Sequence, residues 1–240
     1  MTIYALTDKG PNKSENEDRI IAGKSILAEG VITAETSKGL LANADGVGGN
    51  NAGAVASNFI ATKLCTLNNI DIDELVAINK ELIALSKDTS EYNGMATTLS
   101  GVYISEDNIL LFNIGNTRTY LLQSRKYLKQ LTSDDTTLNY LLATGQLTSE
   151  TAKDFDKKNE ITACFGGGME ELFKLKIDNM ESVCSPIVIT SDGIHDYVSV
   201  DQMEEIFKQY GVSLETCEVL KEAARIGGSR DDISIVIGDV

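Results

Sequence analysis

Residues 97–123, TTLSGVYISEDNILLFNIGNTRTYLLQ, contain three short apolar runs separated by turn-forming residues. The runs 97–104, 108–115 and 117–123 are rich in β-branched and aromatic side chains, which is typical of β-strands. Their connections are too short for a helical crossover, so the stretch predicts an antiparallel meander. The first two runs alternate only imperfectly between apolar and polar residues, which favours a sheet covered on both faces.

The rest of the chain adds more strands and several amphipathic helices. Similar apolar runs predict strands at 2–8, 39–45, 186–192 and 232–238. Apolar residues at three- and four-residue steps predict helices at 52–64, 75–85, 201–209 and 213–225. Asp71 or Asp73 is expected to cap the second of these helices.

A more polar stretch, residues 131–170, separates these regions. It contains one short amphipathic pattern at 138–142, a second near 149–155 and a glycine triplet, and it predicts a flap subdomain over the main body. Because no internal repeat and no Pro/Ser-rich linker divides the chain, we expect one domain over residues 1–240.

Composition limits the possible partners and the compartment. The chain has 21 Lys and Arg against 36 Asp and Glu, which gives a formal charge of −15. Such a field repels nucleic acid and anionic membranes, so neither is expected as a partner. The chain has four scattered cysteines, no secretory signal and no apolar run of about 18 residues, and these features predict a soluble cytoplasmic protein. Because no extra domain is expected, the default expectation is a monomer.

A single histidine, His195, restricts the catalytic chemistry. Metal sites built from several histidines are excluded, and no G-x-S-x-G or Cys-x5-Arg motif supplies a protein nucleophile. His195 itself is expected to be a turn or packing residue. Carboxylates and hard metal ions are left as the source of catalysis.

The candidate carboxylates share one sequence context, in which an acidic residue stands where a strand meets a turn. They are Glu17, Asp18, Asp45, Asp192 and Asp231. Each one alone is most simply a turn residue or a solvated loop charge. If the strands are neighbours, however, the carboxylates converge at one rim of a sheet, where only a cation offsets their repulsion. Oxygen ligands of this kind suit Mg²⁺ or Mn²⁺.

Two of these carboxylates are followed by glycine. Gly46 comes after Asp45 and Gly193 after Asp192, and each is expected to let the backbone turn sharply.

The order of the motifs resembles the metal-dependent protein serine/threonine phosphatases, the PPM or protein phosphatase 2C-like family, in its compact bacterial form. The resemblance covers nearly the whole chain. It is carried by KSENEDR (13–19), ADGVGGNNAGAVAS (44–57), MATTLSGVYI (95–104), NIGNTRTYLL (113–122), LKQLTSDD (128–135), LLATGQLTSETA (141–152), ITACFGG (161–167), VITSDGIHDYVS (188–199) and GGSRDDISIVI (227–237).

The resemblance implies an α+β fold. Two antiparallel β-sheets would pack as a central sandwich with helices on both outer sides, giving a four-layer α/β/β/α arrangement. It also implies an enzyme that hydrolyses phosphoserine or phosphothreonine in proteins phosphorylated by a cognate Ser/Thr kinase. The reaction would use a water activated by two Mn²⁺ or Mg²⁺ ions, without a protein nucleophile.

The same resemblance assigns roles to individual residues. Asp45 would bridge the two metals and the carbonyl of Gly46 would bind one of them. Glu17, Asp192 and Asp231 would complete the ligand set, while Asp18 would hold a metal-bound water.

Some positions depart from the family pattern. Lys13 stands where an arginine commonly binds phosphate, and it would supply a point charge without bidentate geometry. Asn116 replaces an aspartate associated with a third metal, so such a site would depend on Asp192 and Asp196 alone. Thr97 and Thr98 match a Thr-Thr pair that is expected to set the strand. The flap departs most of all.

Three hypotheses remain open from the residues. The first is an active phosphoprotein phosphatase. The second is a phosphatase-like regulatory domain that binds phosphoprotein without turnover, which only Asn116 and Lys13 favour. The third is a phosphohydrolase for small molecules or a sporulation- or sigma-factor-type regulator phosphatase, which differs from the first only in substrate.

Overall fold

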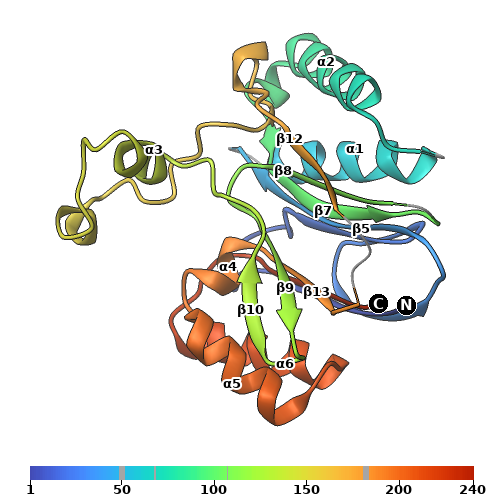
Figure 1. The fold of residues 1–240 in the computed structure, drawn as a ribbon. Helices are drawn as coiled ribbons and strands as arrows, with labels where there is room; N and C mark the ends of the chain where they lie inside the picture. Colours follow the sequence, from blue (N-terminus) through green and yellow to red (C-terminus); the bar gives the residue numbers. More distant parts are fainter. Residues whose placement is uncertain (49–51, 68, 107, 181–183) are drawn as a thin grey trace.

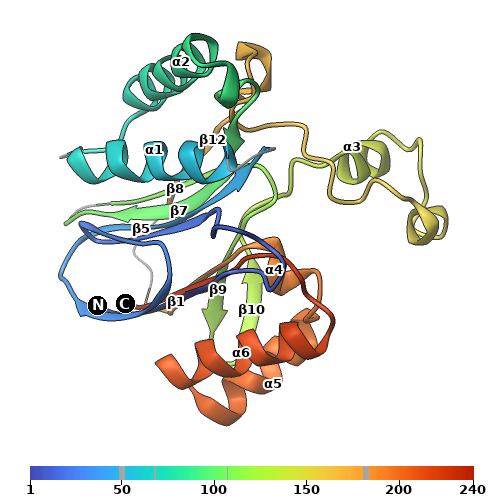
Figure 2. The same ribbon diagram turned by 180° about the vertical axis from the view of Figure 1, so that it is seen from behind.

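The architecture consists of two antiparallel β-sheets that lie face to face, with helices on the outer face of each (Figures 1 and 2). The computed structural model describes residues 1–240 except 49–51, 68, 107 and 181–183. The six-stranded sheet contains, in spatial order, β10 (Tyr127–Gln130), β9 (Arg118–Gln123), β13 (Ile187–Thr190), β14 (Ile233–Asp239), β1 (Thr2–Asp8) and β4 (Gly30–Glu35).

The second sheet has eight strands among the described residues. Its main path is β11 (Phe165–Gly166), β6 (Ala96–Thr97), β5 (Gly39–Val47), β7 (Leu99–Ile104), β8 (Ile109–Ile114) and β12 (Lys176–Met180). Beside this path, β2 (Asp18–Ala22) pairs with β5 and with β3 (Ser25–Leu27).

Two pairs of helices cover the sheets. The eight-stranded sheet is covered by α1 (Ala52–Thr66) and α2 (Ile72–Asp88), and the six-stranded sheet by α5 (Val200–Tyr210) and α6 (Leu214–Ile226). Side chains cap three of these helices, as their sequences favour. The Asp71 carboxylate accepts the Glu74 N–H, which confirms Asp71 as a cap, and serines cap α5 and α6.

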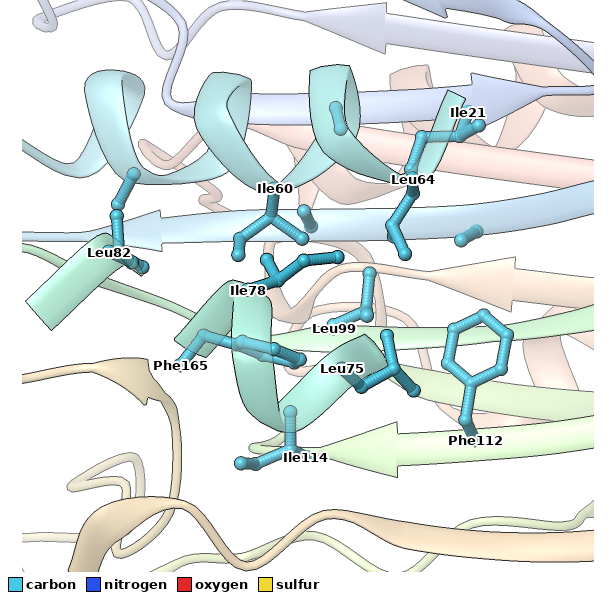
Figure 3. Packing of buried hydrophobic residues seen from close by; sticks show 14 of the residues in the cluster. Ile21, Ile60, Leu64, Leu75, Ile78, Leu82, Leu99, Phe112, Ile114 and Phe165 are labelled. Carbon is cyan, nitrogen blue, oxygen red and sulfur yellow. The ribbon is translucent and has the colours of Figure 1, made fainter. Parts of the chain in front are cut away.

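Apolar side chains fill each of the three spaces between layers. Ile60 and Leu82 from the helices and Phe112 from the sheet belong to one cluster beneath α1 and α2 (Figure 3). A second cluster, which includes Leu41 and Val236, lies between the sheets, and a third lies under α5 and α6. Burial on this scale supplies the main free energy of folding. The predicted four-layer α/β/β/α sandwich is confirmed.

The two ends of the chain lie side by side in the middle of the six-stranded sheet. Strand β1 pairs with β14 in a register that sets Thr2 opposite Asp239 and Asp8 opposite Ile233. The loop after β1 therefore lies beside the loop before β14. This pairing brings residues 10–17 next to residues 231–232.

The predicted meander is wrong in its third strand. Strands β7 and β8 form an antiparallel pair, but β9 leaves their sheet and pairs with β10 and β13 in the other one. Gly115 adopts a φ of 97° at the crossing, a conformation that glycine tolerates. A connection this short redirects the chain between sheets rather than closing a hairpin.

Other differences are local. The pattern near 149–155 forms a single 3₁₀ helix, Thr151–Asp154, rather than an α-helix, while α3 (Thr137–Ala143) confirms the earlier pattern. Short strands such as β2 and β12 were not predicted. Asp107 in the first predicted turn, and residues 49–51 of the second motif, lie outside the described residues.

Part of the predicted flap, the segment around α3, projects sideways from the sandwich (Figure 1), whereas Phe165–Gly166 near the end of residues 131–170 form β11 of the eight-stranded sheet. Two further 3₁₀ helices, Ser90–Tyr92 and Glu170–Leu172, lie elsewhere in the chain. Within the described ranges, we find no helix with both the length and the apolar character needed to span a bilayer.

Candidate metal centre

Five acidic residues predicted from sequence lie around one end of the sandwich. Asp18 and Asp45 are directly paired across β2 and β5. Asp192 begins α4 (Asp192–His195) immediately after β13, and Glu17 and Asp231 precede β2 and β14. A pocket of about 490 Å³ is lined by Lys13, Glu17, Asp45, Gly46, Asp192 and Asp231, among others.

The predicted location at one rim of a single sheet is wrong. Strand β5, which carries Asp45, belongs to the eight-stranded sheet, whereas β13, which precedes Asp192, belongs to the other. The carboxylates therefore meet across the gap between two sheets. Sheet packing brings them together, and no strand-to-strand pairing could have predicted it.

The two glycines of the site allow close approach of neighbouring backbone, which corrects the predicted sharp turns. Strand β5 continues through Gly46 to Val47, and Asp192–Gly193 opens a helix. A Cβ on Gly46 would lie 2.2 Å from the Gly53 carbonyl oxygen in α1, and one on Gly193 would lie 1.9 Å from the Asp232 carbonyl oxygen. Both distances are impossible contacts, so only glycine fits there.

The backbone of Glu17 is fixed by three hydrogen bonds from different elements. Its carbonyl oxygen accepts the Gly46 N–H at 3.1 Å and the Ser57 hydroxyl at 2.6 Å. Its N–H donates to the Asp232 carboxylate at 2.7 Å. These bonds join β5, α1 and the start of β14 to the residue that precedes β2.

Asp232 is the residue that sequence reasoning missed. Its side chain is 2% exposed, and its carboxylate accepts the N–H of Gly10 at 2.8 Å as well as that of Glu17. It therefore joins two loops 222 residues apart in the chain. The tandem Asp231–Asp232 was the available signal, but only its first member was given a role.

The ammonium of Lys13 lies among three carboxylates. Its Nζ is 2.5 Å from Asp231 Oδ1, 3.0 Å from Asp232 Oδ2 and 3.2 Å from Glu17 Oε2. Burial disfavours the charged amine, but Asp231 and Asp232 outweigh it and raise the pKa of Lys13. The Lys13 side chain therefore stays protonated and places one positive charge inside the acidic cluster.

Burial and mutual repulsion act on the remaining carboxylates. Burial, followed by the charges of Asp232 and Asp192, raises the pKa of Asp18 to about 8. Burial and the charges of Asp231 and Asp196 raise the pKa of Asp192 to about 6. Asp45 is also raised well above its ordinary pKa, by burial and then by Asp18. Such a cluster gains stability from a bound cation.

Asp18 has the most exceptional environment. Its side chain is 1% exposed, and neither carboxylate oxygen has a hydrogen-bond partner of ordinary geometry among the described residues. The hydroxyls of Ser191 and Ser234 lie near enough to favour its charged form. A buried carboxylate without partners is costly, and a bound ion or ordered water resolves that cost.

The threonine pair holds the strand that carries Asp45. The Thr97 hydroxyl and the Thr98 N–H both donate to the Asp45 carbonyl oxygen at 2.9 Å. The Asp45 N–H donates in turn to the Thr98 hydroxyl at 3.2 Å. The prediction that these threonines set the strand is confirmed.

Amide side chains form hydrogen bonds with Asp192 and Asp196, the two carboxylates on which a third metal site would depend. Asn116 Nδ2 donates to Asp192 Oδ2 at 2.9 Å, and Asn159 of the projecting segment donates to Asp196. Each amide donates an N–H to one carboxylate without adding charge. Asn159 was not predicted from sequence, because it lies in the segment that departs most from the family pattern.

The projecting segment contributes to two neighbouring pockets. Asn159, Glu160 and Ile161 line the carboxylate pocket, and a second pocket of about 600 Å³ lies beside it. Arg118 borders this second pocket and forms a two-pronged ion pair with Asp134, with nitrogen–oxygen distances of 2.6–3.1 Å.

His195 has a packing role, as predicted. It is 8% exposed, and its Nδ1 lies 2.8 Å from the Thr190 hydroxyl. Burial, together with the charge of Arg118, lowers its pKa well below the ordinary value, so the imidazole stays neutral.

The residues present fit hard divalent ions in chemistry, although they do not form a finished cage. Among the residues that the structure describes, no three Asp, Glu, His or Cys side chains are grouped closely enough to hold an ion as they stand. Glu17 and Asp231 instead face the Lys13 ammonium. The donors are carboxylate and carbonyl oxygens, the class that Mg²⁺ and Mn²⁺ prefer.

Comparisons of the sequence with known proteins point to one family. A family model described as Protein phosphatase 2C matches residues 30–225. The serine/threonine phosphatase stp of Listeria monocytogenes serotype 4b is 29% identical, over 96% of this chain and 92% of that protein.

Solved structures similar to this one are also serine/threonine phosphatases. Stp1 from Staphylococcus aureus, a serine/threonine phosphatase, superposes with a TM-score of 0.82 at 26% identity, over 99% of this chain and 94% of that one. The catalytic domain of the serine/threonine protein phosphatase PstP, solved with two manganese ions, gives 0.74 at 28% identity, over 99% and 98%.

Proposed function

The chain belongs to the protein phosphatase 2C family of serine/threonine phosphatases, and from that premise we propose that it hydrolyses phosphoserine and phosphothreonine in proteins with the help of bound divalent metal ions. The observation that carries the proposal is the convergence of Glu17, Asp45, Asp192 and Asp231 on one pocket. The substrates would be proteins phosphorylated by a Ser/Thr kinase.

The carboxylates would hold two Mn²⁺ or Mg²⁺ ions. We assign Asp45, Glu17, Asp192, Asp231 and the carbonyl of Gly46 as the residues that would hold these ions. The PstP structure with two manganese ions supports this number for a relative of the same fold. Such a pair of ions supplies an activated water and neutralises charge on the phosphoryl oxygens.

The chain's own residues would prepare the substrate. Lys13 would attract a phosphate oxygen as a point charge. Asp18, whose oxygens have no protein partner of ordinary geometry among the described residues, would orient a water beside the ligands. Residues 159–161, which line the pocket, would shield the reacting phosphate from bulk solvent.

The wider organisation follows the same proposal. Residues 1–240 would form one catalytic domain, with residues 131–170 as a flap that shapes substrate choice, and the protein would act as a monomer. A third metal is not part of the proposal, because Asn116 and Asn159 already bind the carboxylates that would hold it.

The test is hydrolysis of a phosphothreonine peptide and of p-nitrophenyl phosphate with Mn²⁺, with Mg²⁺ and with EDTA. We expect turnover that requires metal and that Asp45→Asn lowers by at least about 10³-fold. The matched control is Asp178→Asn, an exposed carboxylate on β12, which should keep full activity. Folded protein without metal-dependent turnover on either substrate would refute the proposal and favour a domain that only binds phosphoprotein.

A further inference from the structure

The Lys13 ammonium is surrounded by three carboxylates that take up its N–H donors. A protonated lysine carries three N–H bonds. Its Nζ contacts carboxylate oxygens of three residues, Asp231, Asp232 and Glu17, at 2.5, 3.0 and 3.2 Å. Lys13 lies in the pocket lining, and its side chain is 29% exposed. The geometry thus assigns one carboxylate to each N–H bond.

The three partners are not equivalent. Asp232 is 2% exposed and is also bound by the N–H groups of Gly10 and Glu17, so it anchors the lysine permanently. Glu17 and Asp231 are more exposed, at 15% and 46%, and both are proposed metal ligands. A divalent ion and the ammonium therefore require the same oxygens on these two residues.

We propose that Lys13 is an internal cation that holds Glu17 and Asp231 in the metal-free protein, and that divalent ions displace it from both before it can bind phosphate. This inference rests on the proposed function. Displacement leaves Lys13 attached to Asp232 and frees two N–H donors beside the pocket. Metal loading thus precedes phosphate binding, and Lys13 couples the two events.

Substitution of Lys13 by a neutral residue should have opposite effects on metal affinity and on stability without metal. Replacing Lys13 by a neutral residue removes both the competitor for the two carboxylates and the repulsion between the ammonium and an incoming divalent ion. The metal-free protein, in contrast, loses the charge that offsets carboxylate repulsion. Lys13→Gln should therefore bind metal more tightly and unfold more easily without metal.

The experiment is calorimetric titration of Mn²⁺ into chelator-treated protein. We compare the wild type with Lys13→Gln and with Lys9→Gln. Lys9 is an exposed lysine four residues earlier, whose ammonium donates to the Ser14 carbonyl oxygen at 3.4 Å. We expect the Kd for Mn²⁺ to fall about tenfold in Lys13→Gln and to change by less than about twofold in Lys9→Gln. Circular dichroism confirms that each variant is folded.

Thermal unfolding without metal supplies the second readout. Lys13→Gln should melt below Lys9→Gln in EDTA, and the difference in melting temperature should narrow at saturating Mn²⁺. A third readout follows the Lys13 NH₃⁺ resonance by NMR, assigned by its loss in Lys13→Gln. Saturating Mg²⁺ should shift this resonance, and inorganic phosphate should shift it again only after Mg²⁺ is present.

The possible results separate this inference from the proposed function. If Lys13→Gln binds Mn²⁺ no more tightly than Lys9→Gln, or if Mg²⁺ leaves the Lys13 resonance unchanged, the inference is wrong even in an active phosphatase. If affinity rises tenfold in a protein without turnover, the inference stands and the proposed reaction fails. A wild type that binds no Mn²⁺ overturns both.

Discussion

Asp18 and Asp45 stand directly opposite each other in the antiparallel register of β2 and β5, and burial raises the pKa of both. The pair is a source of instability in the metal-free protein, because two ionised carboxylates on neighbouring strands repel each other.

Metal-free protein should lose stability as the pH rises from about 4 to about 8. Asp18 and Asp192 have folded-state pKa values raised to about 8 and about 6, above their unfolded values near 4. Between these limits the folded state binds more protons than the unfolded state, so raising the pH favours unfolding. Asp45→Asn should raise the free energy of unfolding at pH 8 by roughly 1–2 kcal/mol, and by almost nothing near pH 4.

Denaturant unfolding in EDTA at several pH values measures this effect. Asp178→Asn is the matched control, since it removes one exposed carboxylate from the surface of β12. An Asp45→Asn variant that is less stable than wild type at pH 8 without metal would show that the carboxylates do not repel one another.

Gly193→Ala should be strongly destabilising. The new Cβ would lie 1.9 Å from the Asp232 carbonyl oxygen and 3.0 Å from the Asp232 carbonyl carbon, and these two backbone atoms cannot move independently. We expect a loss of about 3 kcal/mol or more in the free energy of unfolding, together with weaker metal binding, since Asp192 and Asp232 would be forced apart. Gly145→Ala, where a Cβ meets nothing within 4 Å but φ is 72°, should cost only about 1 kcal/mol. Equal losses in the two variants would contradict the argument.

Asn116→Asp should add a weak cation-binding site beside Asp192. The change replaces the amide donor that binds Asp192 at 2.9 Å with a second carboxylate. We expect a lower melting temperature in EDTA and one additional weak Mn²⁺ in calorimetric titration, because Asp192 and the new carboxylate share the charge of an ion. Asn179→Asp, on the exposed surface of β12, should change neither quantity. An unchanged metal stoichiometry would argue against a latent third site.

The thiols should differ sharply in reactivity. Cys184 is exposed, whereas Cys164 and Cys217 are buried, and burial raises the pKa of their thiols to about 11 and about 12. Because the thiolate is the reactive species, a thiol reagent at pH 8 should modify Cys184 at least about a hundredfold faster than either buried thiol. Stopped-flow labelling of native and urea-unfolded protein measures the rates, and Cys184→Ser should remove the fast phase. A fast phase that persists in this variant would refute the assignment.

Local sequence patterns predicted most elements of this fold, because periodicity and caps act within a few residues. The helices α2 and α6 and the strands β1 and β14 were recognisable in this way. The sheet to which β9 belongs was not, since partner choice depends on packing between segments far apart. β2 escaped detection because five buried residues in a row follow a charged loop and show no alternation.

The candidate site shows the same division. The acidic residues could be found one by one, and their order along the chain carried the resemblance to a family. Their positions on two different sheets, the anchoring role of Asp232 and the contact of Asn159 with Asp196 all depend on tertiary structure. The reason for Gly193 was likewise hidden, because the atom that excludes a side chain belongs to Asp232, 39 residues later in sequence.

The pairing of β1 with β14 also has a consequence for biosynthesis. Glu17 depends on a hydrogen bond to Asp232, 215 residues away, and β14 is the last strand of the fold to leave the ribosome. Nascent chains that lack this strand cannot complete the acidic cluster, however much of the eight-stranded sheet has already formed. The acidic cluster is therefore completed in one late step, when β14 inserts beside β1.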